Sequence, residues 1–544
     1  MTAALTWSGV SVSFGDRTIL RDINLSVSRG QTLALVGESG SGKTMCCMAA
    51  LGMLPKGGKV TSGTIAGPDG HWVNAEGGRT VPIPRGRRVT MVFQEPMTSL
   101  DPTMRCGQQI AEVILRHGTL TADSARMRVM SLFEEVQLPD PERAWSAYPH
   151  GLSGGQKQRV LIAMALANDP DIILADEPTT ALDSALRAEL LDLLGEIQRR
   201  RGLALVLVTH DMDVVERSAD RVAVLRHGVI VEEGPVDAVL HSPQHPYTRG
   251  LLACRVPTMG RPTPLPVLSD FMEDGAPAME NASQIAQVPD ANPAILEVAG
   301  AWKTYPGGTD PAISDVDLRI PEGGTLGIVG GSGCGKTTLA RAILGLHRLD
   351  RGTIRIAGQS VESLNKEQVQ HIRRNVGLIF QDPRAALNPT RRIGSVLKEV
   401  LVRWGHDASA ANQRARELMT AVGLEEDALD RKPDAFSGGQ RQRIVIARAL
   451  AAEPRLLICD EAVAALDVSV QAQVLNLLVQ LREERGLALL FISHDLGVVR
   501  YLCDQTLVMD RGRVVESGAS DRIWASPTHE ITRRLQAAGG GAID

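Results

Sequence analysis

The sequence is poor in aromatic residues, in net charge and in long apolar runs. Its 544 residues include only 7 Phe, 4 Tyr and 6 Trp, so the cores must be aliphatic and stacking platforms for single-stranded nucleic acid are not expected. A formal net charge of −5 argues against a protein that binds polyanions by neutralising their phosphates. Apolar runs such as residues 203–208 are much shorter than the roughly 20 residues that cross a bilayer.

The cysteines and the first residues exclude further classes of protein. The 7 cysteines form no CxxC pair and no regular spacing, so neither a disulfide framework nor a zinc site is expected. The chain starts without a charged segment followed by an apolar one, so we expect no secretory leader. Both observations favour a reduced, cytosolic protein. A chain of 544 residues is also too long for one hydrophobic core, which predicts two or more domains.

The chain contains two copies of one set of motifs. A Ser-Gly-Gly-Gln segment, an Asp-Glu pair and a His-Asp pair begin at positions 153, 176 and 210, and each recurs 284 positions later, at 437, 460 and 494. Between the copies lies a proline-rich stretch without a sustained apolar period. We therefore predict one domain at residues 1–255, a linker at 256–293 and a second domain at 294–544. Short aliphatic runs alternate with helical patterns in each copy, which indicates an α/β fold with a mostly parallel sheet.

Each copy has a glycine-rich loop of the form GxxxxGK[ST] after an aliphatic run. Successive amides and a helix N-terminus form a cradle for phosphate there, and a Cβ would block the turn. The lysine is expected to reach the β- and γ-phosphates of ATP, and the threonine to bind Mg²⁺. The predicted loop residues are Gly37, Glu38, Ser39, Gly40, Ser41, Gly42, Lys43 and Thr44, then Gly330, Gly331, Ser332, Gly333, Cys334, Gly335, Lys336, Thr337 and Thr338.

A second aliphatic run in each copy ends in two carboxylates. Asp176 and Asp460 would hold the Mg²⁺ ion, and the next residues, Glu177 and Glu461, would polarise the attacking water. A strand that ends in a carboxylate is common by itself, but its position behind a phosphate loop makes the pattern specific.

The Ser-Gly-Gly-Gln segments identify the family. With them the chain resembles the ABC ATPases over both halves. The resemblance implies, in each copy, a RecA-like parallel sheet core with an antiparallel β subdomain and a helical signature subdomain. It also implies a head-to-tail pseudodimer, in which each signature segment contacts the nucleotide of the other copy. The signature residues are Ser153, Gly154, Gly155, Gln156, Ser437, Gly438, Gly439 and Gln440.

Other positions also match this family. The resemblance implies that Gln94 and Gln381 contact Mg²⁺, and that His210 and His494 contact the γ-phosphate. It further implies that an aromatic residue stacks on adenine and that a short D-loop follows each carboxylate pair. The aromatic residues are Phe14 and Tyr305, and the D-loops begin at Ala181 and Ala465.

Three segments resemble the importers of oligopeptides, dipeptides and nickel. They are the extensions after the glutamines at 94–102 and 381–389, the stretch 460–473, and a His-Pro-Tyr-Thr segment at 242–252 with a degraded copy at 526–535. The resemblance implies a fused pair of importer ATPases at the cytoplasmic face of the membrane, with two permease subunits and an extracytoplasmic binding protein as partners. Some relatives place an iron–sulfur cluster after this segment; only Cys254 lies there, so we expect none.

Two other classes of protein fit the sequence less well. A soluble twin-cassette ATPase acting on ribosomes or DNA would need a charged helical arm, whereas residues 256–293 are rich in proline and poor in Lys and Arg. A P-loop kinase or GTPase has no use for the Ser-Gly-Gly-Gln segment. The cargo stays open among peptides, glutathione-like compounds, nickel chelates and opines.

Overall fold

Buried aliphatic strands form the centre of two separate units. The structure is a computed structural model that describes residues 3–78, 80–94, 99–118, 120–179, 182–257, 260–272, 283–284, 292–307, 310–361, 366–464 and 466–538. One unit comprises Met1–Leu182, Leu186–Ala253 and Leu268–Ala276, and the other comprises Asp183–Ala185, Cys254–Val267 and Pro277–Asp544. We call them unit 1 and unit 2.

Unit 1 contains an antiparallel sheet and a mostly parallel sheet. The antiparallel sheet has the order β2-β1-β4-β5, and the other has the order β10-β9-β3-β8-β7-β6, in which only β10 runs antiparallel to its neighbour. The strands are β1 (Ala3–Phe14), β2 (Arg17–Ser28), β3 (Thr32–Val36), β4 (Gly58–Gly67), β5 (Gly70–Asn74), β6 (Val89–Val92), β7 (Ile172–Asp176), β8 (Ala204–Val208), β9 (Arg221–Arg226) and β10 (Val229–Pro235).

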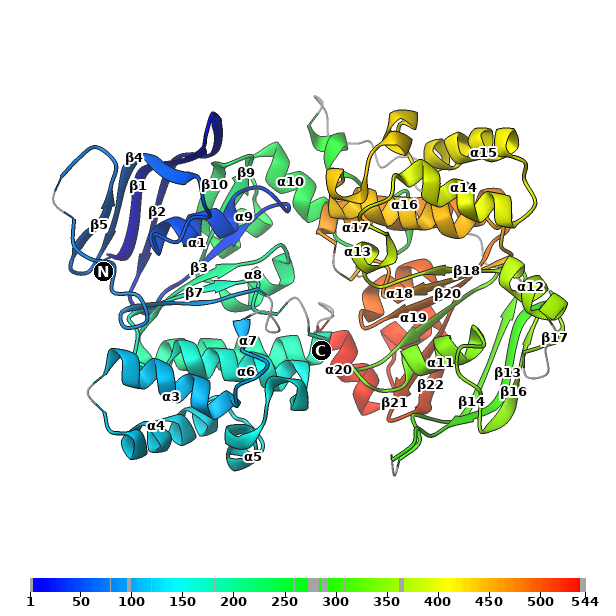
Figure 1. Ribbon diagram of the computed structural model, residues 1–544, viewed down its shortest axis with the longest axis horizontal. Coiled ribbons are helices and arrows are strands. Elements are labelled where there is room, and N and C mark those ends of the chain that lie inside the picture. Colours follow the sequence, from blue (N-terminus) through cyan, green and yellow to red (C-terminus); the bar gives the residue numbers. More distant parts are fainter. Residues whose placement is uncertain are drawn as a thin grey trace. The chain divides into compact units, whose positions relative to one another are not determined.

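The helices of unit 1 surround the parallel sheet. They are α1 (Lys43–Ala50), α3 (Cys106–His117), α4 (Ala122–Glu135), α5 (Pro141–Ser146), α6 (Gly154–Ala165), α7 (Ser184–Arg201), α8 (Met212–Ser218), α9 (Val236–His241) and α10 (Pro246–Ala253). Figure 1 shows the antiparallel sheet and the group α3–α5 on opposite sides of the parallel sheet. Strands β3, β7 and β8 are buried along their whole length, as expected for parallel strands covered on both faces.

Unit 2 repeats this plan. Its antiparallel sheet has the order β14-β13-β16-β17, and its mostly parallel sheet has the order β18-β19-β20-β15-β21-β22, the same topology read from the other edge. The strands are β13 (Ala294–Lys303), β14 (Ile313–Pro321), β15 (Thr325–Val329), β16 (Arg351–Ile356), β17 (Gln359–Ser360), β18 (Val376–Ile379), β19 (Leu456–Asp460), β20 (Ala488–Ser493), β21 (Gln505–Asp510) and β22 (Arg513–Ala519).

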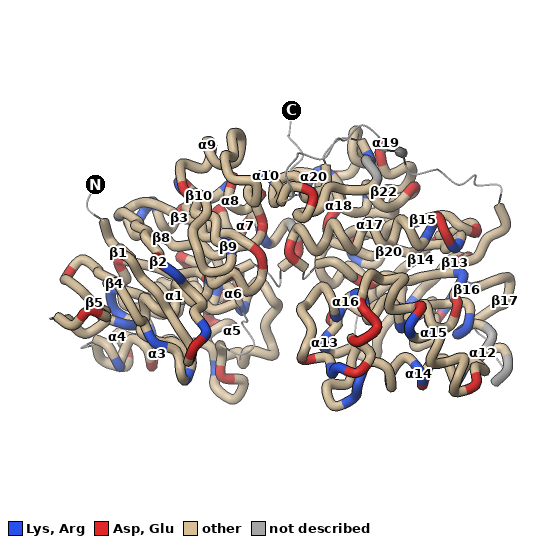
Figure 2. Tube along the Cα trace, turned by 90° about the horizontal axis from the view of Figure 1, so that it is seen from above, with Lys and Arg blue, Asp and Glu red and all other residues tan. Residues whose placement is uncertain are grey.

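The helices of unit 2 follow a similar order, and α12 has no counterpart among the described helices of unit 1. They are α11 (Lys336–Ile343), α12 (Lys366–Asn375), α13 (Pro383–Ala386), α14 (Ile393–Arg403), α15 (Ala408–Ala421), α16 (Gly438–Leu450), α17 (Val468–Arg485), α18 (Leu496–Leu502), α19 (Ser520–Ala525) and α20 (Glu530–Ala538). None of the described helices is long and apolar enough to cross a membrane. Figure 2 shows basic and acidic residues interspersed along the trace of both units.

The stretch predicted as a linker has more structure than its proline content suggests. Short strands β11 (Pro262–Thr263) and β12 (Ser283–Gln284) pair, and Leu268–Phe271 forms a 3-10 turn. Leu265 is buried on unit 2, where its backbone N–H and C=O bond the Asn476 side chain at 2.7 and 2.8 Å. Arg261 is also buried and lies 3.5 Å from Asp504. Contacts between residues so far apart along the chain cannot be predicted from the local composition. The predicted domain boundaries stay predictions.

Candidate active sites

The loop between β3 and α1 of unit 1 has the backbone that the glycines predict. Gly37, Gly40 and Gly42 have φ values of 146°, 82° and 109°, which favour glycine. A Cβ at Gly37 would lie 2.1 Å from the carbonyl oxygen of Leu225, so no other residue fits there. No side chain caps the N-terminus of α1, so its first amides can face an anion.

The loop between β15 and α11 of unit 2 repeats this geometry. Gly333 and Gly335 have φ values of 77° and 109°, and a Cβ at Gly330 would lie 2.3 Å from the carbonyl oxygen of Met509. The N-terminus of α11 likewise has no side-chain cap. Cys334 is buried in this loop, and its burial raises the pKa of the thiol. The predicted loop residues of each unit therefore come together around one helix start.

Both loop lysines fold back on their own loop. The ammonium group of Lys43 donates to the carbonyl oxygens of Gly37 at 2.7 Å and Glu38 at 3.0 Å. Lys336 donates to the carbonyl oxygens of Gly330 at 2.7 Å and of the next residue at 2.9 Å. Both lysines are buried, so each positive charge is held inside the loop where phosphate oxygens would approach.

The strand-end aspartates lie beside these loops. The Thr44 hydroxyl donates to Asp176 Oδ1 at 3.1 Å, which joins the end of β7 to the start of α1. Burial raises the pKa of Asp176 to about 6; the Thr44 hydrogen bond opposes that rise, and the charge of Glu177 adds to it. Burial also raises the pKa of Asp460. Oxygen ligands of this kind suit a hard divalent cation.

The two predicted catalytic glutamates have a strained backbone. Glu177 and Glu461 have φ values of 45° and 48°, in the left-handed region that side chains rarely adopt. The backbone N–H of Glu177 donates to Val208 at 3.0 Å, and that of Glu461 donates to Ile492 at 2.9 Å. The neighbouring strand therefore holds each glutamate in this conformation and turns its side chain out of the sheet.

The predicted glutamines and histidines contact these glutamates. In unit 1, Gln94 Nε2 donates to Glu177 Oε2 at 2.7 Å, and His210 Nδ1 lies 3.1 Å from Glu177 Oε1. In unit 2, Gln381 Nε2 donates to Glu461 Oε2 at 2.5 Å, and His494 Nδ1 lies 3.9 Å from Glu461 Oε1.

The contact with His494 lowers the pKa of Glu461. A carboxylate that is ionised and held by both oxygens can accept a proton from a water molecule. Each unit thus brings together the predicted glutamine, glutamate and histidine.

The Ser-Gly-Gly-Gln segments begin helices α6 and α16. Ser153 Oγ accepts a hydrogen bond from the Gln156 N–H at 3.3 Å, and Gln156 Oε1 accepts one from the Ser153 N–H at 3.0 Å. Ser437 and Gln440 form the same capping box, at 3.3 and 3.1 Å. The exposed serine and the glycine that follows, Gly154 or Gly438, leave a helix N-terminus open to an anion.

The two predicted adenine-stacking residues lie in different environments. Phe14 ends β1 and packs partly into the core of unit 1, against Gly58. Tyr305 is 38% exposed, and its hydroxyl lies 3.4 Å from Thr338 Oγ1, beside the start of α11. Ala181, Ala465 and residues 95–98 of the first glutamine extension lie outside the described residues.

One contact at the first loop was not predicted. The Tyr247 hydroxyl, from the His-Pro-Tyr-Thr segment, accepts a hydrogen bond from the Glu38 N–H at 3.0 Å. Tyr247 is fully buried, and the Arg226 guanidinium lies 5.2 Å from its ring centre. The two residues are 209 positions apart, so no local pattern in the sequence could have joined them.

Comparisons with known proteins agree with this geometry. The family model described as "ABC transporter" matches residues 20–180 and 313–464, and the model "Oligopeptide/dipeptide transporter, C-terminal region" matches residues 231–269. The "Glutathione import ATP-binding protein GsiA" of Pectobacterium atrosepticum is 41% identical over 96% of this chain and 87% of its own length. Its namesake from Escherichia coli K12 is 40% identical over 95% of this chain and 86% of its own length.

Part of the chain is also similar to solved structures of ABC proteins. The cbiO1 structure from Clostridium perfringens, described as part of the ABC transporter complex cbiONQ, is 28% identical and covers 43% of this chain and 91% of its own, with a TM-score of 0.40.

The fold and the sites thus define a tandem pair of ATP-hydrolysing cassettes. The chain belongs to the ABC transporter family, as an ATP-binding importer subunit of the oligopeptide/dipeptide type. The predicted α/β fold class, the family and the ATPase activity are confirmed.

Proposed function

We propose that this chain supplies the energy for importing peptide-like compounds, working at the cytoplasmic face of a membrane with two permease subunits and an extracytoplasmic binding protein. The match of residues 231–269 to the oligopeptide/dipeptide C-terminal region carries this proposal. The relatives named for glutathione import support a tripeptide-sized cargo, because the similarity extends over nearly the whole chain.

Within each unit the chemistry is the hydrolysis of ATP. Lys43 and Lys336 bind the β- and γ-phosphates, together with the amides at the starts of α1 and α11. Glu177 and Glu461 accept the proton of the water that attacks the γ-phosphorus, and ADP leaves from the other side. The histidine and glutamine that contact each glutamate orient its carboxylate.

The donor set of each site fits Mg²⁺. In unit 1 the Thr44 hydroxyl already lies against Asp176, and both offer oxygen to a hard cation beside the phosphate loop. Thr44, Gln94 and Asp176 would hold the ion in unit 1, and Thr337, Gln381 and Asp460 would hold it in unit 2. When bound, Mg²⁺ neutralises phosphate charge.

We further propose that each signature segment completes the ATP site of the other unit. The helix starts at Ser153 and Ser437 support this, because each offers backbone amides and a serine hydroxyl to a phosphate group. Neither helix start has a phosphate loop beside it in the sequence. ATP would then join the units and hydrolysis would separate them, which moves the attached permeases.

Uptake in the organism that encodes the chain tests this function. Deleting its gene should reduce the import of labelled glutathione or of a labelled dipeptide to background, while nickel uptake stays normal. The wild-type chain should restore import, and a chain with both Glu177→Gln and Glu461→Gln should not. Unchanged uptake of every peptide tested would contradict the proposal. In the purified chain, ATPase activity should disappear when a chelator removes Mg²⁺.

A further inference from the structure

Unit 2 has a pocket at the edge of its parallel sheet that lies away from the phosphate loop. Its volume is about 630 Å³, and it lies at the amino ends of β15, β19 and β20, lined by Gly323, Arg455 and Leu487 among others. The phosphate loop follows the carboxyl end of β15. The pocket is therefore separate from the ATP site, and nothing in the proposed function uses it.

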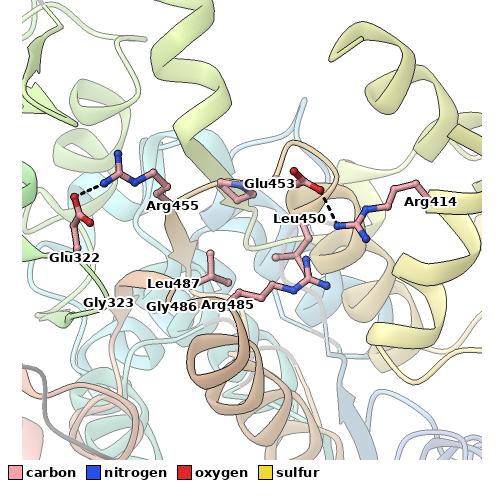
Figure 3. A pocket seen from close by; sticks show the side chains of 10 residues that line it. Glu322, Gly323, Arg414, Leu450, Glu453, Arg455, Arg485, Gly486 and Leu487 are labelled. Atoms are coloured by element: carbon pink, nitrogen blue, oxygen red, sulfur yellow. Dashed lines mark hydrogen bonds and ion pairs between the residues drawn. The ribbon is translucent and has the colours of Figure 1, made fainter. Parts of the chain in front are cut away.

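The pocket is lined by three arginines and two glutamates. Arg455 forms an ion pair with Glu322 on one side of the pocket, and Arg414 Nη2 lies 2.9 Å from Glu453 Oε1 on the other side (Figure 3). The third arginine, Arg485, is the last residue of α17, and its guanidinium lies on the same side as Arg414 (Figure 3). Among the described residues Arg485 has no ion pair, although Glu484 and Glu453 attract it and Arg414 repels it.

Unit 1 shows what the corresponding arginine binds. Arg201 is the last residue of α7, as Arg485 is of α17, and it forms a bidentate pair with Glu135, the last residue of α4. Its Nε lies 2.8 Å from Glu135 Oε1, and its Nη2 lies 2.5 Å from Oε2. Arg200 adds a third bond to Oε1 at 2.7 Å. A carboxylate held in this way is a strong and directional interaction.

In unit 2 this carboxylate is absent, while part of its surroundings is kept. The helix α15, which corresponds to α4, ends at Ala421. The pair between Arg128 and Asp169 of unit 1 recurs as the pair between Arg414 and Glu453. Asp169 and Glu453 even share a φ of 52°. Two further features differ: Glu484 stands where unit 1 has Arg200, and Arg201 also lies 2.6 Å from Asp169 Oδ1, whereas no ion pair joins Arg485 to Glu453 among the described residues. The pocket opens beside Arg485, the arginine that the missing glutamate would bind.

We infer that this pocket binds a small organic carboxylate, whose carboxyl group pairs with Arg485 as Glu135 pairs with Arg201. The volume of about 630 Å³ admits a molecule larger than one carboxyl group. Glu322 and Glu453 in the wall repel a compact anion such as phosphate more than a dicarboxylate, whose two charges lie further apart, because like charges repel most at short range. The guanidinium fork instead matches a planar carboxylate.

Thermal unfolding of the full chain with succinate as the probe tests this inference. Millimolar succinate should raise the Tm of the wild-type chain by about 2–4 °C over sodium chloride of equal ionic strength, because a ligand stabilises the state that binds it. Ala421→Glu, which rebuilds the pair of unit 1, should abolish this rise. Arg485→Gln should abolish it as well. Calorimetry should find one site per wild-type chain and none in Ala421→Glu.

The reverse change in unit 1 gives an independent test. Glu135→Ala should lower the Tm and create a second succinate site, so that succinate restores part of the lost stability. An equal rise in the wild type and in Ala421→Glu, or a rise with phosphate but not with succinate, would overturn the inference. Failure of succinate to restore any stability to Glu135→Ala would also count against it.

Discussion

The two cassettes of this chain share one topology but brace their phosphate loops differently. In unit 1 the buried Tyr247 hydroxyl bonds the Glu38 N–H at 3.0 Å. The position 284 residues later is Ile531, which has no hydroxyl to offer. The second loop therefore lacks this brace, although its glycines and its lysine adopt the same geometry as in the first.

The turn that precedes these two residues is the same in both units. Glu232 accepts the N–H groups of Gln244 and His245 at 2.7 and 3.1 Å. Glu516 accepts those of Thr528 and His529 at 2.9 and 3.0 Å. The docking of the segment thus does not depend on the tyrosine.

The anchor of this turn is a carboxylate in both units. Burial opposes ionisation of Glu516, but hydrogen bonds from Thr532 and from the two turn amides outweigh it and lower the pKa to about 2. The pKa of Glu232 is lowered in the same way. Charge-assisted hydrogen bonds to a glutamate therefore hold this turn in both units. The residue that follows the turn differs, since it is Tyr247 in unit 1 and Ile531 in unit 2.

The glutamates also differ between the two sites. Glu177 Oε1 lies 3.1 Å from His210 Nδ1, whereas Glu461 Oε1 lies 3.9 Å from His494 Nδ1. Both sites still hold the full set of lysine, aspartate, glutamate and histidine, so we predict that both hydrolyse ATP.

Replacing the two glutamates that we propose as catalytic should have the largest effect, on ATPase activity. A general base contributes roughly 10²–10⁴-fold to a rate, so Glu177→Gln with Glu461→Gln should reduce steady-state ATPase activity by about 100-fold or more. Each single replacement should also reduce turnover. Nucleotide binding, measured separately, should persist in all three variants. An unchanged rate in one single variant would show that its site is silent.

The strand-end aspartates should give the next largest effect, on stability. The folded pKa of Asp176 is about 6, raised from 3.8, so its stabilising contribution is complete below about pH 3.8 and is lost as the pH rises through 6. Asp176→Asn should therefore raise the free energy of unfolding by about 2 kcal/mol at pH 8 and change it little at pH 4.

Asp460→Asn is the matched control. Asp460 is less buried than Asp176, so its replacement should raise the Tm by a smaller amount at pH 8. Calorimetry at pH 4 and at pH 8 measures the Tm and the unfolding free energy of the two variants. Both variants should also lose ATPase activity in the affected site. A lower Tm for Asp176→Asn at pH 8 would contradict the raised pKa of the buried carboxyl group.

Sequence patterns predicted the elements whose residues are close together along the chain. The glycines at 37 and 330 have one possible cause, a turn in which a Cβ would meet a backbone carbonyl, so the loops could be recognised directly. The aliphatic runs at β3 and β8 are buried on both faces, which a parallel sheet requires. The capping boxes at Ser153 and Ser437 were not predicted, although each joins residues only three positions apart.

Features that depend on distant residues could not be predicted. The left-handed φ of Glu177 is set by a hydrogen bond to Val208 on a neighbouring strand, and a lone glutamate gives no sign of it. The contacts of Arg261 with Asp504 and of Leu265 with Asn476 join the predicted linker to residues more than 200 positions away. The environment of Phe14, which is partly core, is also decided by packing.

Removing the Tyr247 hydroxyl should have the smallest effect and the most specific one. Tyr247→Phe keeps the buried ring and loses one hydrogen bond to the first loop, which is worth about 1 kcal/mol, or about fivefold in affinity. The loss should fall on the first ATP site alone. Fluorescent ATP binding in a Lys336→Ala background, where only the first loop keeps its lysine, should weaken by that factor.

The second loop supplies the control for this change. In a Lys43→Ala background, Tyr247→Phe should leave binding to the second loop unaltered, because Ile531 stands where the tyrosine would be and makes no such bond. Equal weakening in both backgrounds would mean that the tyrosine acts on the whole chain and not on its own loop. Unaltered binding in both would mean that the hydrogen bond to Glu38 adds nothing to nucleotide affinity, and that the two loops differ in structure only.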